Sequence, residues 1–484
     1  MAAVVIAGAS VAGLASALAL SGQGHDIVVL ERGPRPPEGP YGEVVGDWHR
    51  PLVPQAAHSH TLAALGVKVL RERAPRVLAA LREAGAVALD LTAALPPTVK
   101  DREPRSDDAE LTALGCRRGT LDLVLERAVR ALPDVRIAYG DGVRALRLEA
   151  DGRRVTGVVT AGGPLAADIV IDATGRRAES RRWLTAEGVP VADDETAPSG
   201  LSVFSRFHRL RPGARPGPLG RGNAAGIVGR HYAGLLHPGE DGTFGVLIGA
   251  LPGDQTLAAL GDPERFAAVA RLTPGLAPWL EQADPVSPVH TMTAPHNALR
   301  GLATTRQRPV AGLFAVGDAV CVTDPLYARG VSLALAGAFR LADLLASAPA
   351  VDIALSRRVA RSNEELYGPW FRQSADDDRI RIAQWRAAIA GRPAPSVPTA
   401  LGGRPLLSEA CAAAASDGEV WRGLTRMLTG LRTREEVFDD AEFRARVRRA
   451  PAIGTSTHLL APGRAELARA LGSYDVRGRF DRAA

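Results

Sequence analysis

The stretch from Ala3 to Arg32, AVVIAGASVAGLASALALSGQGHDIVVLER, constrains the possible folds of this chain most strongly. Its pattern predicts a buried strand over 4–7, a turn from Gly8 to Gly13, a helix that ends near Ser21 and a second strand over 26–30. A strand, a glycine turn, a helix and a second strand in this order typically bind a dinucleotide at the edge of a parallel sheet. We therefore predict a dinucleotide site at this turn.

The individual residues of the turn support this prediction. Gly8 permits the tight turn after the strand, and Gly13 lets helix and strand approach closely. The free N–H groups at the helix start, together with the helix dipole, can hold a pyrophosphate. Ser10 replaces the middle glycine of the G-x-G-x-x-G fingerprint but is small enough for a pyrophosphate to pass. Glu31 can accept hydrogen bonds from a ribose 2′-hydroxyl and would repel a 2′-phosphate, which favours FAD or NAD over NADP.

A second informative stretch runs from Leu313 to Leu335, LFAVGDAVCVTDPLYARGVSLAL. A buried strand leads into Asp318, and a loop with Pro325 leads into a helix that begins near Gly330. One carboxylate at a strand end, followed by a helix start, suits the ribityl chain and the electron-rich edge of a flavin. We expect Asp318 to accept hydrogen bonds from ribityl hydroxyls and the amides of 330–332 to face flavin N1 and O2. A capping aspartate in an ordinary strand–turn–helix unit is the alternative.

These features together resemble FAD-dependent oxidoreductases of the aromatic-hydroxylase type, the group A flavin monooxygenases. A further segment, RPLVPQAAHSH from Arg50 to His60, resembles the R-x-G-V-P-Q-x-x-H-x-H segment of the polyether epoxidase branch. The sequence departs from the family pattern at Leu52 and Ala328, where glycines are found in the family. The other blocks that carry the resemblance are the glycine turn with Glu31, the segment Asp172-Ala-Thr-Gly-Arg176, and Gly317-Asp318 with Asp324-Pro325 and Gly330.

The resemblance implies a particular architecture. It implies an α/β fold in which an FAD-binding Rossmann-like domain is interleaved with a β-sheet substrate domain and followed by C-terminal helices. Residues 1–184 and 297–347 would form the discontinuous FAD-binding domain, 185–296 the substrate-binding sheet domain, and 348–484 the C-terminal helical region.

The resemblance also assigns contacts to FAD. Residues of the glycine turn would line the pyrophosphate, Glu31 and Arg32 the adenosine, and the backbone of Val143 the adenine. Asp318 would meet the ribityl chain, and Pro325 and the following helix start would lie beside the isoalloxazine ring. The full set of residues that we expect at the cofactor is Gly8, Ala9, Ser10, Ala12, Gly13, Glu31, Arg32, Arg50, Arg118, Val143, Gly317, Asp318, Pro325, Gly330, Val331 and Ser332.

The reaction that the resemblance implies depends on the flavin itself. NAD(P)H would bind transiently and reduce FAD, O₂ would add at C4a, and the C4a-hydroperoxyflavin would deliver oxygen to the substrate. A catalytic acid or base from the protein is optional in this scheme, and His58 and His60 are the candidates. The sequence contains no second G-x-G-x-x-G motif followed by a strand with a terminal acid, which agrees with transient NAD(P)H binding.

We therefore predict a monooxygenase, either an epoxidase or a hydroxylase, that acts on an apolar small molecule of specialised metabolism. A dehydrogenase, a desaturase or a reductase of a prenyl-like substrate, working without oxygen transfer, is the alternative, and a non-catalytic module that retains the fold is a further one. The loop DPLYARG also resembles that of flavin-dependent halogenases. Their W-x-W-x-I-P signature is missing, since no W-x-W occurs in the sequence.

The substrate cavity is expected between the flavin and a second sheet over 201–296. Aromatic residues make up only 5% of the chain, which favours an aliphatic cavity and a polyketide- or terpene-like substrate over a simple phenol. An aromatic side chain on a strand commonly belongs to the core instead, and a histidine is commonly a satisfied hydrogen-bonding group. The candidate lining residues are Phe204, Phe207, Tyr232, His237, Met292 and His296.

Composition excludes several other classes of protein. The formal net charge is +6, but only two of the 59 basic residues are lysines and the arginines form no long basic run, so we expect no nucleic-acid partner. Three widely spaced cysteines without a C-x-x-C motif argue against a disulfide framework or a metal site and favour a cytoplasmic protein. Residues 1–24 are uncharged but lack a basic leader and are interrupted by the glycine turn, so we expect no transmembrane segment. The oligomeric state stays open.

Overall fold

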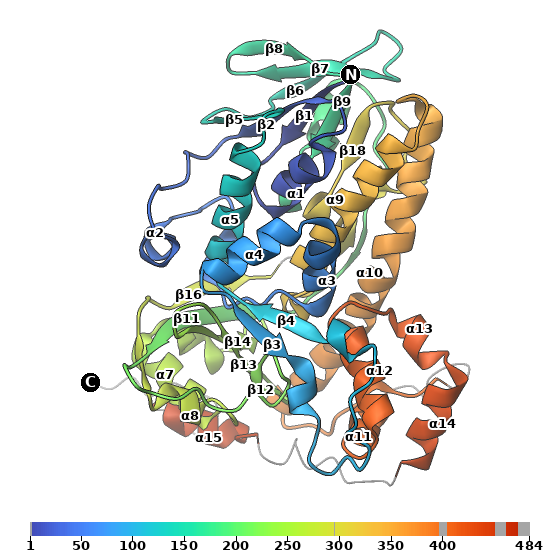
Figure 1. The fold of residues 1–484 in the computed structure, drawn as a ribbon. Coiled ribbons are helices and arrows are strands. Elements are labelled where there is room, and N and C mark those ends of the chain that lie inside the picture. Colours follow the sequence, from blue (N-terminus) through green and yellow to red (C-terminus); the bar gives the residue numbers. More distant parts are fainter. Residues whose placement is uncertain (1, 295, 396–403, 451–460, 473–484) are drawn as a thin grey trace.

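The upper half of the molecule in Figure 1 is built on a five-stranded parallel sheet with the strand order β18-β9-β1-β2-β5. The computed structural model describes residues 2–294, 296–395, 404–450 and 461–472. Within the sheet, Val5 lies opposite Val28 on one side and Val170 on the other, a β-branched pattern that is usual for a parallel sheet buried on both faces. The strands are β1 (Ala3–Ala7), β2 (Asp26–Glu31), β5 (Val135–Tyr139), β9 (Ile169–Asp172) and β18 (Leu313–Ala315).

Helices cover one face of this sheet, and a small antiparallel sheet covers the other (Figure 1). The antiparallel sheet contains β6 (Ala145–Leu148), β7 (Val155–Thr160) and β8 (Gly163–Ala166). The helices are α1 (Val11–Leu20), α3 (Ala64–Arg73), α4 (Pro75–Glu83), α5 (Arg118–Arg130) and α9 (Gly330–Ala346).

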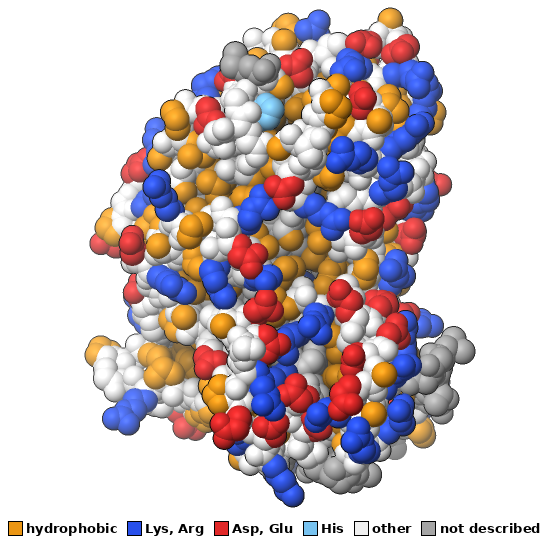
Figure 2. Space-filling model, turned by 45° about the vertical axis from the view of Figure 1, so that its right-hand side comes forward, with side chains coloured by type: hydrophobic (Ala, Val, Ile, Leu, Met, Phe, Trp, Pro, Cys, Tyr) orange, Lys and Arg blue, Asp and Glu red, His pale blue; other side chains and the backbone are white. Residues whose placement is uncertain are grey.

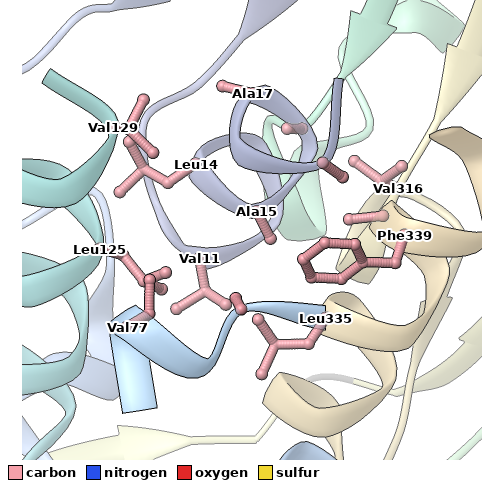
Figure 3. Close-up of a cluster of buried hydrophobic side chains, with 14 of the residues drawn as sticks. Val11, Leu14, Ala15, Ala17, Val77, Leu125, Val129, Val316, Leu335 and Phe339 are labelled. Carbon is pink, nitrogen blue, oxygen red and sulfur yellow. The ribbon is translucent and has the colours of Figure 1, made fainter. Parts of the chain in front are cut away.

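Helix α1 lies at the centre of the main apolar core. Figure 3 shows Leu14 of α1 beside Val129 of α5, and Ala15 of α1 beside Phe339 of α9. Full burial of a large apolar side chain such as Leu14 contributes about 1.5–3 kcal/mol. The first helix after the glycine turn is therefore held in place from both sides.

The lower half contains a second sheet, which is antiparallel and has the order β12-β13-β14-β11-β15, with β16 also paired to β11. One of its faces encloses Phe204, Tyr232 and Phe244 in a core with α7, α8 and α15. The other face packs Val203 in a cluster with Trp385. These elements are β11 (Ser202–Leu210), β12 (Ala225–Val228), β13 (Ala233–Pro238), β14 (Thr243–Ala250), β15 (Ala283–Pro285), β16 (His290–Thr293), α7 (Pro263–Leu272), α8 (Ala277–Leu280) and α15 (Arg464–Ala470).

Two features connect the halves. A three-stranded sheet of β10 (Glu195–Ala197), β17 (Asn297–Leu299) and β19 (Cys321–Val322) lies where the chain passes between them. Helix α10 (Ile353–Ile389) is 37 residues long, packs on α9 in the upper half and reaches the second sheet in the lower half (Figure 1).

The C-terminal helices pack in the lower half against a hairpin from early in the chain (Figure 1). Arg422 is buried there and pairs with Asp108 at 2.9 Å. The hairpin, which falls within the range expected for the FAD-binding domain, thus lies with these helices. The elements are β3 (Val87–Asp90), β4 (Thr112–Gly115), α11 (Leu407–Ala414), α12 (Gly418–Leu428), α13 (Arg434–Phe438) and α14 (Ala441–Arg449).

The structure confirms the predicted α/β fold with a parallel sheet, a second sheet and C-terminal helices. The segment over 33–54 is rich in proline and glycine, which predicts a loop, but this local prediction is wrong, because the segment contains a short helix, α2 (Tyr41–Asp47). Arg127 of α5 stacks on Tyr41, with its guanidinium carbon 4.3 Å from the ring centroid. This tertiary contact has no signal in the local sequence, where two glycines lower the helix propensity.

Gly13→Ala should destabilise the protein. A Cβ at this position would lie 1.9 Å from the carbonyl oxygen of Gly8 and 3.2 Å from the Cβ of Ala173, so α1 would have to move away from the sheet. Overpacking of this kind costs about 1–3 kcal/mol and occasionally more, which urea unfolding measures as a lower free energy of unfolding. Gly261→Ala is the control, because nothing lies within 4 Å of its added Cβ. Equal stability of the two variants would contradict the close packing.

Candidate functional site

A cavity of about 560 Å³ lies between the two halves. Glu31 and Val143 line its upper end, Asp318 lines its middle, and Leu247 and Met292 of the second sheet line its lower end. The glycine turn, the segment over 48–60 and the turn after β9 also contribute to the wall. The cavity therefore joins the predicted nucleotide site to one face of the second sheet.

The glycine turn presents backbone donors to this cavity. Gly8 has a φ of 107°, and a Cβ there would lie 2.6 Å from the carbonyl oxygen of Ala173, so glycine is required. No side chain caps the first turn of α1, and this turn carries no acidic residue. The N–H groups of Val11 and Ala12 can therefore donate to an anion within the field of the helix dipole.

Glu31 is fixed at the end of β2. Its carboxylate accepts hydrogen bonds from the backbone N–H groups of Ala9 at 2.8 Å and Gly33 at 2.7 Å. Tyr139 and Val143 line the cavity nearby. An acceptor thus stands at the strand end where the sequence predicts a ribose.

A buried carboxylate, Asp122, organises the wall beside the glycine turn. It accepts hydrogen bonds from Ser10 Oγ at 3.2 Å and Arg118 Nε at 3.1 Å, and it forms an ion pair with Arg50. Burial by itself raises the pKa of Asp122, but the two guanidinium groups outweigh burial and hold the pKa below its ordinary value. Two arginines and one carboxylate leave one net positive charge next to the donors of α1.

Asp318 follows β18 and faces the middle of the cavity. Gln55 Nε2 lies 3.5 Å from its Oδ2. Burial raises the pKa of Asp318, although the positive charges of Arg176, Arg118 and Arg300 oppose this shift. A poorly solvated carboxylate of this kind gains from hydroxyl donors on a ligand.

Asp172 holds the turn that follows β9. Its carboxylate accepts hydrogen bonds from the backbone N–H groups of Thr174 at 2.9 Å and Ser180 at 2.8 Å. Arg300 donates to the carbonyl oxygen of Arg176 at 2.7 Å. These contacts fix a section of the cavity wall, into which the sequence block 172–176 folds.

Buried charges tie the loop after β19 to helix α10. Arg381 of α10 lies 2.9 Å from Asp324 and 2.8 Å from Asp378, and Asn297 Nδ2 donates to Asp378 at 2.6 Å. Burial, followed by the neighbouring Asp324 carboxylate, raises the pKa of Asp378. Asp378 therefore keeps its proton at neutral pH.

His58 and His60 line the lower part of the cavity. His58 Nδ1 lies 2.9 Å from Ser205 Oγ, whereas neither ring nitrogen of His60 has a hydrogen-bond partner among the described residues. Burial is the main cause that lowers the pKa of His58 to about 4 and that of His60 to about 3. Both imidazoles are neutral at neutral pH and can orient a ligand by hydrogen bonds without carrying charge.

Most residues that the sequence assigns to the cofactor meet at this cavity. Gly13, Gly317 and Ser332 do not line it and lie behind the wall, where a Cβ on Gly317 would be 2.8 Å from that of Ala12. The residues that line it are Gly8, Ala9, Ser10, Ala12, Glu31, Arg32, Arg50, Arg118, Val143, Asp318, Pro325, Gly330 and Val331.

The substrate side differs from the expectation. Of the six candidate lining residues, only Met292 lines the cavity. Phe204 and Tyr232 point to the opposite face of the second sheet and belong to its core. Side chains alternate along a strand, and Val203 and Leu247 are presented to the cavity instead.

The remaining three candidates also lie outside the cavity. His237 is buried, and its Nδ1 lies 2.9 Å from Oγ of Ser59, which lines the cavity. Ser59 therefore lies between His237 and the cavity. Phe207 is further along β11, and His296 is exposed. Their positions agree with the ordinary structural roles of strand aromatics and histidines.

Several charged residues of the site were missed, and Asp122 and Arg329 are two of them. Asp122 follows Arg118 by four residues, a spacing that signals a pair on one helix face. Arg329 is buried in the cavity wall and donates to Gln373 Oε1 at 2.9 Å and Ser374 Oγ at 3.0 Å on α10. No spacing in the sequence links Arg329 to that helix.

Within the described ranges, no group of three or more His, Cys, Asp or Glu side chains is placed to hold a metal ion. In the same part of the chain, no helix has the length and apolarity needed to cross a bilayer. Figure 2 shows acidic and basic side chains interspersed over the lower half of the face in view.

The proton that Asp378 keeps in the folded protein should make stability depend on pH. The folded protein keeps a proton on Asp378 that the unfolded chain releases above about pH 4. The folded state thus binds more protons above this pH, so the free energy of unfolding falls as the pH rises toward the raised pKa. Asp378→Asn, whose amide donates to Asp324 without titrating, should reduce this fall in urea unfolding between about pH 5 and about pH 9.

Asp376→Asn is the matched control, because Asp376 is exposed and pairs with Arg379 on the helix surface. It should keep the pH dependence of the parent protein. An equal pH dependence in the parent, the control and Asp378→Asn would show that Asp378 holds no such proton in the folded protein.

Comparison with known proteins identifies solved structures that share this fold. No family model matches the chain. Protein Rv3254 of Mycobacterium tuberculosis is 29% identical over 359 residues, which cover 68% of this chain and 70% of that protein. The flavin-dependent brominase Bmp2 is 16% identical, with 93% of this chain and 97% of Bmp2 covered and a TM-score of 0.58. The p-nitrophenol 4-monooxygenase PnpA of Pseudomonas putida DLL-E4 is 17% identical, with 93% of this chain and 99% of PnpA covered and a TM-score of 0.55. The chain therefore has the fold of flavin monooxygenases and halogenases, which confirms the predicted resemblance at the level of the fold.

Proposed function

We propose that this chain is an FAD-dependent oxidoreductase that works as a monooxygenase, an epoxidase or hydroxylase, on an apolar small molecule. The observation that carries the proposal is the continuous cavity from Glu31 past Asp318 to Leu247 and Met292. It connects a nucleotide-binding turn with an apolar wall of the second sheet. The fold shared with a flavin-dependent enzyme supports the same proposal.

The residues at the upper and middle parts of the cavity fit FAD. The first-turn donors of α1 and the net positive charge of Arg50, Asp122 and Arg118 suit a diphosphate. Glu31 suits an adenosine ribose without a 2′-phosphate. Asp318 offers acceptors to ribityl hydroxyls.

The start of α9 fits the flavin ring. Pro325, Gly330 and Val331 line the cavity, and no side chain caps the first turn of this helix. Free N–H groups at a helix start favour a negative charge nearby. They would therefore stabilise the reduced, anionic flavin at N1 and O2.

When bound, FAD supplies electron transfer from a transient NAD(P)H and the activation of O₂. The protein holds the substrate and keeps water away from it. Val203, Leu247 and Met292 form an apolar wall, and the neutral His58 beside them can give or accept a hydrogen bond. No titrating acid or base of the protein is needed at this wall.

Stopped-flow absorbance of the photoreduced protein mixed with oxygenated buffer tests the oxygen chemistry. We expect a transient band between those of oxidised and reduced flavin, with a lifetime that changes when lipophilic alkenes or phenols are added. Direct reoxidation with release of peroxide, whatever substrate is present, would contradict a monooxygenase. Anaerobic turnover with an artificial acceptor would then identify a dehydrogenase, desaturase or reductase.

Asp318→Ala should weaken FAD binding while the protein stays folded. The substitution removes acceptors for ribityl hydroxyls, so we expect the dissociation constant of FAD to rise about tenfold or more. Quenching of FAD fluorescence during titration measures the constant, and circular dichroism checks the fold. Asp343→Ala is the control, because Asp343 lies in an exposed pair with Arg73. Unchanged FAD affinity in Asp318→Ala would refute the assigned contact.

A further inference from the structure

Arg176 is a half-buried cation in the cavity wall that lacks an acidic partner. Its Nη2 lies 3.4 Å from Met292 Sδ, and no carboxylate oxygen of the described residues lies within 4.0 Å of its guanidinium. Burial lowers the pKa of Arg176, and the charge of Asp318 offsets only part of this effect. A guanidinium in this state gains strongly when an anion binds to it.

The other half-buried or buried arginines of the cavity wall are already paired. Their guanidinium groups meet carboxylates or neutral acceptors from the protein itself, so they need no ligand to satisfy them. The pairs are Arg50 and Arg118 with Asp122, and Arg329 with Gln373 and Ser374.

The phosphates of FAD would not satisfy Arg176. The donors that suit a diphosphate lie at the glycine turn and around Asp122. The guanidinium of Arg176 instead acts on Asp318 in the middle of the cavity and on His58 in the lower part, where its charge helps to lower the pKa of the imidazole. Its contact with Met292 of β16 places it on the side of the cavity next to the second sheet.

The turn presents Arg176 in a fixed orientation. Asp172 holds both ends of the turn through Thr174 and Ser180, and Arg300 donates to the carbonyl oxygen of Arg176. Ala178 has a φ of 43°, a left-handed conformation that costs energy in a residue with a Cβ. A strained turn fixed by so many contacts is typical of a wall that positions a ligand.

The surroundings of Arg176 define what that ligand is. Val203, Leu247 and Met292 supply an apolar surface, and the Arg176 guanidinium contacts Met292. The planar guanidinium matches the two oxygens of a carboxylate. We propose that the substrate is an apolar carboxylic acid and that Arg176 holds its carboxylate. This inference rests on the proposed function, since it names the substrate class of the same cavity.

Calorimetric titration of the FAD-loaded protein with matched acids and amides tests the inference. The probes are cinnamate and octanoate, each compared with its uncharged amide. We expect both acids to bind at least about tenfold more tightly than their amides. Arg176→Gln should abolish this difference with unchanged FAD content, and Arg176→Lys should keep part of it. Arg144→Gln, which changes an exposed arginine that does not line the cavity, should behave like the parent protein.

The possible results separate this inference from the proposed function. Equal binding of acids and amides by the parent protein, failure of both acids to bind, or an acid preference that persists in Arg176→Gln would overturn it. Loss of FAD in Arg176→Gln would place the residue at the cofactor and would also overturn it. A parent protein that takes up no FAD, but prefers acids through Arg176, would refute the proposed function and leave the anion site standing.

Discussion

The close contact between α1 and the ends of β1 and β9 is the constraint on which both fold and cavity depend. Gly8 and Gly13 lack the Cβ atoms that would otherwise collide with backbone oxygens and with Ala173. Helix α1 can therefore begin directly at the strand ends and still bury Leu14 among its neighbours. The same contact that fills the core leaves the first-turn N–H groups at the cavity wall. Tight packing and free backbone donors at the cavity wall are thus two consequences of one geometry.

The parallel sheet and its helices were predictable because their signals are local, namely apolar strand-length runs, a 3.6-residue period and a glycine turn. Helix α2 was not, because its support comes from Arg127 stacking on Tyr41 rather than from its own sequence. The cavity-facing side of β11 was not predictable either. Alternation gives a strand two faces, and whether Val203 or Phe204 meets the cavity depends on which elements cover each face.

The site was predictable to a similarly uneven extent. Glu31 and Asp318 follow parallel strands, whose carboxyl ends meet at one edge of a sheet, so their common location at the cavity follows from the fold. The lower wall is different, since His58, Val203 and Met292 come from three separate segments and no spacing relates them. Buried polar contacts of this kind depend on tertiary packing and leave no periodic trace in a sequence.

Helix α10 determines a dimension of the cavity. Tyr367 donates to the carbonyl oxygen of Leu333 in α9, Arg381 pairs with Asp324 in the loop after β19, and Trp385 Nε1 donates to Gly229 in the lower half. A helix rises about 1.5 Å per residue and resists compression. The number of helical residues between these contacts therefore sets the distance between that loop and the second sheet. Side-chain substitutions in the wall can alter which molecules fit the cavity. A change in the depth of the cavity requires the insertion or deletion of residues in α10.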